Sequence, residues 1–331
     1  MLFFFIKRIL TSIPVLIGIS LIAFTIIQLP PGDYANSYKN EIMSLGGVSE
    51  SDADIMAQKL RVKYGLDKPV FTQYLIWIKN IITEGNFGYS FSYQRDVSEL
   101  ILERLPRTLL IALLAHAIST VIGILLGIYV ARYKYSIFDN LITVTSYLLT
   151  SVPRFSLALI VYFVLVFHFD VKEVSSLYSP QYALAPWSFD KLLNLLIHIA
   201  PVVLIAGLGG LARNIRVMRG NLLDVINSQY IQTARSKGLK ESKVIIKHAV
   251  PNALHPIIMY QGMIFPYMIE GELEAAIVLS IPTMAPMFYT AILKHDIYVA
   301  GSFLFVYGIM LLVGNILADL CLAWLDPRIS T

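Results

Sequence analysis

Long apolar runs separated by polar segments constrain the fold of this chain more than any other feature. A helix of about 20 residues, rising about 1.5 Å per residue, crosses the roughly 30 Å hydrocarbon core of a membrane. Six such runs occur, at residues 9–29, 109–131, 141–169, 192–212, 253–280 and 300–324. Charged residues make up only 15% of the chain, which argues against two soluble domains. The sequence therefore predicts an all-α polytopic membrane protein with six transmembrane helices.

The first apolar run resembles a signal peptide, because Lys7 and Arg8 precede it. It is too long for the apolar core of a signal peptide and no small-residue cleavage site follows it, so we expect a retained first span. The predicted organisation is an N-terminal transmembrane helix (1–29), an extracytoplasmic loop domain (30–108), a core of five helices (109–325) and a cytoplasmic tail (326–331).

The connection over residues 30–108 carries the signals of folded structure. Residues 51–64 begin at a serine, have early acids and late bases, and are followed by Gly65, which is typical of a capped helix. Residues 70–82 bring Tyr74, Trp77 and Ile81 to about one face, which indicates a helix lying on the bilayer surface. We therefore expect a small folded element here instead of a disordered linker.

Two apolar runs carry residues that are costly in lipid. The third run is interrupted around Ser151, Pro153 and Arg154. Proline removes a backbone hydrogen bond in mid-helix, and an arginine must face a polar interior or a wet cavity. One interpretation is a kinked helix that lines a translocation path. The other is a kink whose polar groups are satisfied by neighbouring helices.

The fifth run carries Glu270, Glu272 and Glu274 around Gly271, and these three carboxylates cannot all face lipid. Either they line a water-filled vestibule, or the helix breaks near Gly271 and they lie at its outer end. In the second run, Gly123 and Gly127 form a ridge of small residues that predicts close approach of another helix.

The distribution of charge predicts the orientation of the chain. With the N-terminus inside, the inner segments (1–8, 132–140, 213–252 and 325–331) carry 13 basic and 4 acidic residues. The outer connections (30–108, 170–191 and 281–299) carry 12 basic and 14 acidic residues. Basic residues concentrate on the cytoplasmic side of membrane proteins, so both termini are expected in the cytoplasm. The net charge of +4 then needs no nucleic acid to explain it.

A polar, basic segment at residues 230–256 lies between two apolar runs and needs a separate explanation. The pattern predicts a helix over 221–237 and another over 240–250, with Gly238 in a left-handed conformation at the bend. Ala234 would let a partner backbone approach closely, and Arg235 and Lys237 would pair with acidic groups of that partner. A plain charged loop would also fix orientation, but it would not explain an ordered helix–glycine–helix.

This segment resembles the coupling motif of binding-protein-dependent ABC importer permeases, in particular the B-type subunits of the oligopeptide/dipeptide/nickel permease family. The motif residues are Thr233-Ala234-Arg235-Ser236-Lys237-Gly238-Leu239, His248, Asn252-Ala253-Leu254 and Pro256, with Pro251 thirteen residues after Gly238. Further matches run along the chain: Phe5-Ile6-Lys7-Arg8-Ile9, Pro31-Gly32-Asp33, Tyr64-Gly65-Leu66-Asp67-Lys68-Pro69, Asn86-Phe87-Gly88-Tyr89-Ser90, Pro106-Arg107-Thr108-Leu109, Ser151-Val152-Pro153-Arg154-Phe155 and Leu325-Asp326-Pro327-Arg328. Two positions depart from the family pattern. Ala276 and Pro282-Thr283 stand where the family has a glutamate and a Pro-Gly, and Pro251 replaces an arginine.

The resemblance implies the type I importer permease fold in a cell membrane. The implied partners are a homologous C-type permease, two cytoplasmic ABC ATPases and an extracytoplasmic substrate-binding protein. ATP and Mg²⁺ would bind to the ATPases and no cofactor to this chain, which lacks a G-x-x-x-x-G-K-[ST] phosphate loop. The residues that would couple the chain to an ATPase, within coupling helices at about 221–250, are Gln232, Thr233, Ala234, Arg235, Lys237, Gly238 and Leu239.

Two other classes of function are alternatives to an importer permease. An ion-coupled secondary transporter would use Arg154, Glu270 and Glu274 as a relay, but no inverted repeat is evident. A membrane-embedded enzyme is disfavoured, because no paired histidines, G-x-S-x-G motif or intramembrane aspartate pair occurs. Within the family, peptides, nickel or other metal chelates, and oligosaccharides are alternative substrates. Peptide is the expectation, and no metal-ligand cluster favours nickel.

Overall fold

The structure is a computed structural model that describes residues 2–29, 32–46 and 48–325. Its regular elements within these residues are helices and two paired two-residue strands, β1 (Tyr89–Ser90) and β2 (Arg95–Asp96). The chain forms two compact units. Of the described residues, the first unit comprises residues 2–6, Thr108–Pro282 and residues 313–325, and the second comprises residues 7–29, 32–46 and 48–107 together with Thr283–Leu312. Three of the described helices are divided between the units: α1 (Leu2–Ile27) begins in the first unit and ends in the second, and α5 (Val97–Arg132) and α14 (Ile297–Leu325) begin in the second and end in the first.

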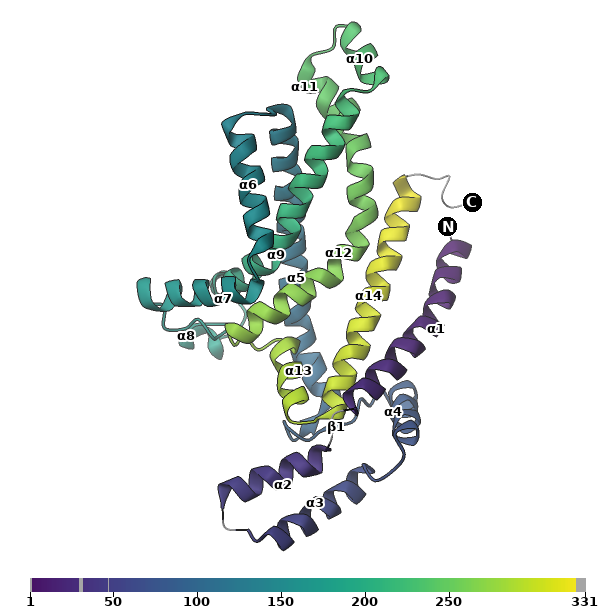
Figure 1. Cartoon of the computed structure of the whole chain (residues 1–331), viewed down its shortest axis with the longest axis vertical. Coiled ribbons are helices and arrows are strands. Elements are labelled where there is room, and N and C mark those ends of the chain that lie inside the picture. The colour runs from purple at the N-terminus through teal and green to yellow at the C-terminus, as the bar shows by residue number, and fades with distance from the viewer. Residues whose placement is uncertain (1, 30–31, 47, 326–331) are drawn as a thin grey trace. The chain divides into compact units, whose positions relative to one another are not determined.

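The first unit is built around α9, whose partners α6 and α12 pack along it (Figure 1). Its elements are α6 (Ile137–Ser151), α7 (Arg154–Phe163), η1 (Val164–His168), α8 (Pro180–Ala183), α9 (Phe189–Ile226), α10 (Gln229–Ser236), α11 (Glu241–Lys243), η2 (Val244–Ala249) and α12 (Val250–Val278). The two η elements are π-helical turns, which occur mostly as short insertions in α-helices.

A sharp break separates α6 from α7, and it is visible in Figure 1 where α7 turns away from the upright α6. The two helices form an angle of 100°. The cause is local: Val152 and Pro153 have extended or polyproline-like ψ values of 126° and 136°, and proline disfavours the α conformation in the residue before it. The position of the interruption was predicted correctly, but its size exceeds a kink within one helix.

The glycine ridge predicted on the second apolar run packs α5 against α9. A Cβ at Gly123 would lie 2.6 Å from the Cβ of Asn214, and a Cβ at Gly127 would lie 2.5 Å from that of Met218. Neither position therefore accepts a larger side chain without moving a helix. The prediction of a close helix approach at this ridge is confirmed.

An ion pair ties α6 to α9. Nε and Nη2 of Arg219 donate to the two carboxylate oxygens of Asp139 at 2.7 and 2.8 Å. The same carboxylate accepts the backbone N–H of Tyr135 at 2.8 Å, and Asp139 is only 1% exposed. A buried carboxylate is stable only when it is paired and hydrogen-bonded, and this geometry meets both conditions.

The second unit contains α1 from Lys7 onward, α2 (Tyr34–Leu45), α3 (Glu50–Tyr64), α4 (Val70–Glu84), the two strands and α13 (Met284–Leu293). The capped helix predicted at 51–64 is confirmed as α3. Its cap is Ser49 and not Ser51, the serine at which the predicted helix begins. The Ser49 side chain accepts the N–H of Asp52, and Gly65 ends the helix in a left-handed conformation, as expected. The aromatic face of α4 packs within the protein, because Tyr74 and Trp77 are buried against Phe24 of α1, and the placement of this helix on a bilayer surface stays a prediction.

A buried carboxylate joins distant segments within this unit. Asp296, directly before α14, accepts the hydroxyl of Ser90 at 2.8 Å and the N–H of Ser92 at 3.0 Å. Burial raises its pKa above the ordinary aspartate value, although these hydrogen bonds oppose the shift. Ser90 and Asp296, which are 206 residues apart in the sequence, thus belong to one compact unit.

Several of the described helices are long and apolar enough to cross a membrane. Four qualify singly, within α1, α5, α9 and α14, and the bent pair α6–α7 makes a fifth if it forms one span. The predicted fifth run coincides with α12, which is continuous through Gly271, so the break considered there is absent. The prediction of a helical chain with several helices able to span a membrane is confirmed, and the count of six spans stays a prediction.

Candidate functional site

The polar segment begins where α9 ends, and this boundary lies earlier than the sequence pattern indicated. The helix predicted over 221–237 is wrong as a single element, because α9 stops at Ile226 and α10 starts at Gln229. Two local side-chain bonds favour the stop. Asn227 Nδ2 donates to the carbonyl of Leu223, and Ser228 Oγ donates to that of Val225. Asparagine and serine compete in this way with helix bonding near helix ends.

One face of α10 is buried in the first unit. Ile231 is fully buried and Ala234 is 8% exposed, and both belong to a cluster with Val244, Ile245 and Ala249 of η2. Burying an isoleucine side chain stabilises a fold by about 1.5–3 kcal/mol, so this cluster fixes the short helix to the rest of the unit. The small size of Ala234 therefore serves packing within the chain, and the approach of a partner at this residue stays a prediction.

The opposite face of α10 is polar and exposed. Gln232, Thr233 and Lys237 are all exposed, while Leu239 packs against the cluster beneath. Figure 1 shows α10 and α11 at the extreme end of the unit, beyond the ends of α9 and α12. A short helix is thus held rigidly on one side and presents polar side chains on the other.

Gly238 makes the turn between α10 and α11. Its φ is +74°, in the left-handed region that L-residues with a side chain resist, as predicted. No described atom other than those of its chain neighbours lies within 4 Å of the position that a Cβ would take. The glycine is therefore required by backbone conformation and not by lack of space.

An ion pair links α10 to α11 across this turn. Nη2 and Nε of Arg235 donate to the carboxylate of Glu241 at 2.7 and 3.0 Å. Hydrogen bonding to Arg235 lowers the pKa of Glu241 below its ordinary value. Arg235 was expected to pair with a partner protein, but in this structure it pairs within its own chain.

A second tie, between α10 and α12, was not anticipated from the sequence. Asn252 Nδ2 donates to the hydroxyl of Tyr230 at 2.9 Å, and it also donates to the carbonyl of His248 at 3.1 Å. Asn252 was noted only as part of a motif and Tyr230 only as the start of the segment. Their separation of 22 residues hides the contact from any helical periodicity.

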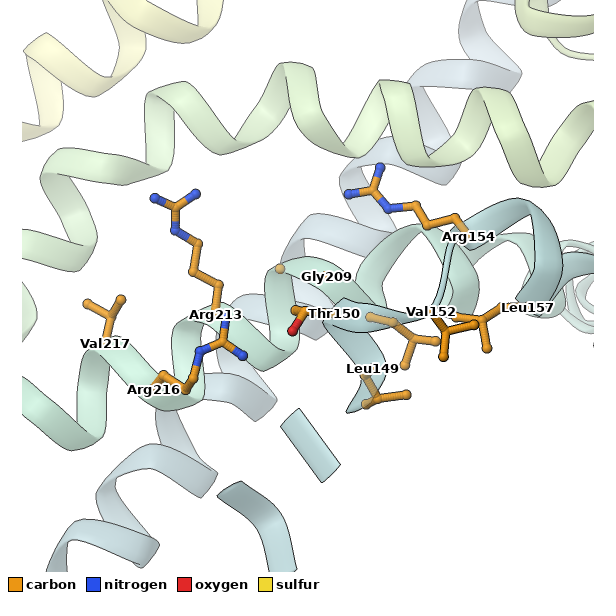
Figure 2. A pocket seen from close by; sticks show the side chains of 11 residues that line it. Leu149, Thr150, Val152, Arg154, Leu157, Gly209, Arg213, Arg216 and Val217 are labelled. Atoms are coloured by element: carbon orange, nitrogen blue, oxygen red, sulfur yellow. The ribbon is translucent and has the colours of Figure 1, made fainter. Parts of the chain in front are cut away.

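A cavity of about 560 Å³ lies in the first unit at the break between α6 and α7 (Figure 2). Its walls include Thr150 and Val152 at the break, Leu157 of α7, and a length of α9 from Leu208 to Val217. Three arginines line it: Arg154, Arg213 and Arg216.

Arg154 spans the space between α9 and α12. Its Nη2 lies 3.1 Å from the position of a Cβ on Gly209, and its Nη1 lies 2.9 Å from that of a Cβ on Gly271. Both glycines therefore leave room for the guanidinium. The sequence predicted that Arg154 faces a polar interior or a wet cavity; in the structure it lines the cavity at the break between α6 and α7.

The other residues predicted for the path lie around Arg154. Ser151 ends α6 and donates to the carbonyl of Tyr147 at 2.8 Å, and Pro153 precedes the first residue of α7. Glu274 accepts the N–H of Phe155 at 3.0 Å, so its carboxylate caps the start of α7. Glu272 is fully buried in α12, and the side chain of Glu270 lies outside the described residues.

Arg213 and Arg216 were counted in the sequence only as charges that fix orientation. Arg216 Nη1 donates to the carbonyl of Ser146 at 3.1 Å. The guanidinium carbon of Arg213 lies 3.5 Å from the centre of the Tyr260 ring. Their place in the cavity wall depends on the break between α6 and α7, which exposes this side of α9.

Comparison with known proteins gives a family for both halves of the chain. Residues 123–331 match the family described as the binding-protein-dependent transport system inner membrane component. Residues 1–112 match the N-terminal family of the same transport membrane components. The chain belongs to this family of inner membrane transport components. The resemblance noted in the sequence is thereby confirmed.

Individual relatives match the permease over its full length. It is 34% identical to the oligopeptide transport system permease protein AppB of Bacillus subtilis, with 99% of each chain covered. It is 32% identical to a putative peptide permease protein of Brucella suis, with 100% of this chain and 99% of the relative covered. Identity to the oligopeptide transport system permease protein OppB of Haemophilus influenzae is 29%, over 99% of each chain.

Family membership decides the general class of function. The permease is a multi-pass membrane subunit of a binding-protein-dependent ABC transport system, and it is a transport protein and not an enzyme. Within the part of the chain that the structure describes, no group of three or more His, Cys, Asp or Glu side chains is arranged to hold a metal ion.

Proposed function

We propose that this permease imports di- or oligopeptides delivered by an extracytoplasmic binding protein, and that it forms the translocation path with a homologous C-type permease. In this proposal six transmembrane helices, with both termini in the cytoplasm and a loop domain outside, form the type I importer fold. Two cytoplasmic ABC ATPases, which bind ATP and Mg²⁺, drive the cycle. The substrate class is supported by the names of relatives that match over the full chain.

The observation that carries the proposal is the way in which α10 is held. It is anchored on one face by Ile231 and Ala234, braced across Gly238 by Arg235 and Glu241, and tied to α12 through Asn252. A short helix that is fixed to the unit on one face and exposed on the other can pass the movement of a bound ATPase on to the transmembrane helices, whereas a flexible loop cannot. We assign Gln232, Thr233 and Lys237 to the surface that meets an ATPase, with Ala234, Arg235, Gly238 and Leu239 holding its shape.

The direction of force transmission follows from the connections of α10. It is linked backwards to α9 by two residues and forwards through η2 to α12. Both of these long helices contact Arg154, at Gly209 and Gly271 respectively. Closure of the ATPases on ATP would displace α10 and shift α9 relative to α12 around the residues assigned to the path: Ser151, Pro153, Arg154, Glu270, Glu272 and Glu274. The shift requires that α10 contact the ATPases differently in the two states.

Reconstitution tests the proposal against ion-coupled transport. The permease, its C-type partner, both ATPases and the binding protein are placed in proteoliposomes, and uptake of a labelled tripeptide is measured. We expect uptake to require hydrolysable ATP and to be unaffected by ionophores that collapse proton and sodium gradients. Uptake that follows an imposed ion gradient in vesicles without the ATPases would refute it. If Ni²⁺ chelates or oligosaccharides compete for uptake and peptides do not, the substrate would be a metal chelate or an oligosaccharide instead of a peptide.

A further inference from the structure

The short turn between α5 and α6, residues 133–136, has no part in the proposal so far. It lies at the same end of the first unit as α10 and α11 (Figure 1). Its basic and aromatic side chains and the two apolar residues that begin α6 are all exposed: Arg132, Tyr133, Lys134, Tyr135, Ile137 at 85% and Phe138 at 60%. Large apolar side chains that lie exposed beside basic ones indicate a surface that contacts another molecule.

The backbone of this turn is fixed, so the exposure of its side chains belongs to the fold. Tyr135 has a φ of +64°, in the left-handed region that residues with a side chain resist. The carboxylate of Asp139 accepts the N–H of Tyr135 at 2.8 Å, and Arg219 in turn donates to that carboxylate. Ser136 caps α6 by accepting the N–H of Asp139 at 3.2 Å. The exposed side chains are therefore carried on an ordered turn.

Two cations of this segment have unused hydrogen-bond donors within the described part of the chain. Neither Arg132 nor Lys134 makes a hydrogen bond or an ion pair with any residue that the structure describes. Each lies over the ring of the tyrosine that follows it. The guanidinium carbon of Arg132 is 5.4 Å from the centre of the Tyr133 ring, and Nζ of Lys134 is 5.2 Å from that of the Tyr135 ring. Because the two cations are two residues apart, their Cα atoms lie within about 7 Å of each other.

A cavity of about 260 Å³ opens between this turn and the segment that carries α10 and α11. Arg132 and Lys134 line it from one side, and Arg235 and Glu241 from the other. Three of the described lining residues are thus cationic and one is acidic, and Arg235 already binds that carboxylate at 2.7 Å. The pKa of Glu241 is lowered first by this bond and also by the charge of Arg132. The cavity therefore has an excess of positive charge, which favours an anion.

The surface that leads to the turn indicates where the anion comes from. Exposed residues spaced by three or four positions form one face on each helix: Val121, Leu125, Tyr129 and Tyr133 on α5, and Ile137, Leu141, Val144 and Leu148 on α6. α5 is long and apolar enough to cross a membrane, and tyrosines gather where such helices reach the lipid headgroups. The cations therefore lie at the level of the lipid phosphates. Inorganic phosphate would match the cations but not the apolar side chains beside them.

We infer that the turn between α5 and α6 binds an anionic phospholipid of the cytoplasmic leaflet. Arg132 and Lys134 hold its phosphate at the cavity, and Ile137 and Phe138 lie among its acyl chains. The inference rests on the proposed orientation of the chain and on the proposed coupling role of α10. Because the ion pair that links α10 to α11 lines the same cavity, the bound lipid stabilises the turn at Gly238 and strengthens coupling to the ATPases.

Photo-cross-linking tests the site directly. The complete transporter is placed in phosphatidylcholine nanodiscs that contain a photoreactive phosphatidylglycerol, and cross-linked peptides are identified by mass spectrometry. We expect cross-links within residues 129–141 that unlabelled phosphatidylglycerol displaces and added phosphatidylcholine does not. A lysine or arginine at a membrane surface strengthens the binding of anionic lipid roughly fivefold. Arg132→Gln combined with Lys134→Gln should therefore reduce cross-linking at a low phosphatidylglycerol fraction by about 30-fold.

Two control variants separate a headgroup site from a general effect of charge. Arg132→Lys combined with Lys134→Arg keeps both charges and should keep the cross-links. Lys240→Gln combined with Lys243→Gln removes two exposed charges from α11 and its N-cap, and neither residue lines the cavity, so cross-linking should be unchanged. An equal loss in this control and in the double glutamine variant of the turn would overturn the inference. Cross-linking by a photoreactive phosphatidylcholine to the same extent would also overturn it.

The other anions that fit the cavity are outcomes of the same experiment. Displacement of the photoreactive lipid by inorganic phosphate at matched ionic strength would assign the cavity to a soluble anion and overturn the inference. Absence of cross-links within residues 129–141 in the complete transporter would overturn it as well. If the cross-links then appear once the ATPases are removed, the cavity binds an acidic group of an ATPase.

Uptake measures the effect of the lipid on coupling. We expect ATP-driven uptake of a labelled tripeptide by wild type to rise as phosphatidylglycerol replaces phosphatidylcholine in proteoliposomes. The variant Arg132→Gln with Lys134→Gln should lose this dependence. Uptake by wild type that does not respond to phosphatidylglycerol would overturn the effect on coupling. If wild type shows no ATP-dependent uptake in any lipid mixture, the proposed function is refuted, and the cross-linking result decides the lipid site independently.

Discussion

Gly238 offers the sharpest test of how α10 is coupled to transport. Its φ of +74° is costly for any residue with a side chain, by about 1–2 kcal/mol, and a β-branched residue is an outlier there. Because no described atom beyond its chain neighbours lies within 4 Å of a Cβ at this position, the substitution Gly238→Val adds strain without a clash. A change of 1–2 kcal/mol corresponds to a factor of about 5–30 in the population of the native turn.

We therefore expect Gly238→Val to lower ATP-driven uptake by about 5–30-fold, because the turn relaxes and the exposed face of α10 no longer meets the ATPase in register. The assay measures uptake and substrate-stimulated ATP hydrolysis by the complete transporter, together with retention of the ATPases on purified permease. Gly238→Asn should keep most of the activity, because asparagine tolerates the left-handed conformation better than valine does.

The control for strain alone is Gly85→Val in the second unit. Gly85 also has a left-handed φ, of +62°, and also has nothing within 4 Å of a Cβ. This variant carries the same backbone penalty far from α10 in sequence and should leave coupling intact. Normal uptake and normal ATPase stimulation in Gly238→Val would refute the reasoning, as would an equal loss of coupling in Gly85→Val.

Three further variants probe the parts that hold the first unit together. Asp139→Asn leaves its arginine partner on α9 without a counter-charge and should lower the free energy of unfolding by about 3 kcal/mol, measured by thermal unfolding in detergent; an unchanged midpoint would contradict the pairing. Gly127→Leu should destabilise the unit strongly by forcing α5 from α9, whereas Gly220→Leu, where a Cβ meets nothing within 4 Å, should be tolerated in the same measurement. Arg235 lowers the pKa of Glu241, so their bond stabilises the turn fully at pH values above the ordinary pKa of glutamate. This stabilisation is lost as the pH falls through the lowered pKa. Glu241→Gln should remove the same bond at neutral pH, and amide hydrogen exchange in α10 should become faster. The change should correspond to less than about 1 kcal/mol in the free energy of local opening, because the pair is largely exposed.

Much of the coupling segment could be predicted because its signals are local. The positive φ of Gly238 follows from the position of a glycine between two polar helical patterns, and no distant contact is needed to infer it. The boundary at Ile226 was missed because residues 221–237 read as continuous helix, while Asn227 and Ser228 end it through side-chain bonds to nearby carbonyls. The inward packing of Ala234 was also missed, because its partners in η2 follow only after the chain has turned.

The cavity could be predicted only in part. Pro153 marks the break between α6 and α7 in any reading of the sequence, and the cost of a charge in lipid places Arg154 beside a polar space. The spacing of Arg213 and Arg216 in the sequence does not show whether they line a cavity or only help to fix the orientation of the chain in the membrane. That distinction appears only when the 100° bend of α6–α7 leaves one side of α9 uncovered.

The sequence by itself determined that this protein is helical, crosses a membrane and carries a basic helix–glycine–helix segment, because apolar length, charge and turn chemistry are properties of contiguous residues. Tertiary structure alone decided which residues the compact units contain, where the aromatic face of α4 points, and what Arg235 pairs with. Each of these depends on contacts between residues that periodicity does not relate, such as Phe24 with Trp77 or Ser90 with Asp296. Non-local contacts form only once the chain has closed its loops, and for that reason they leave no local signal to read.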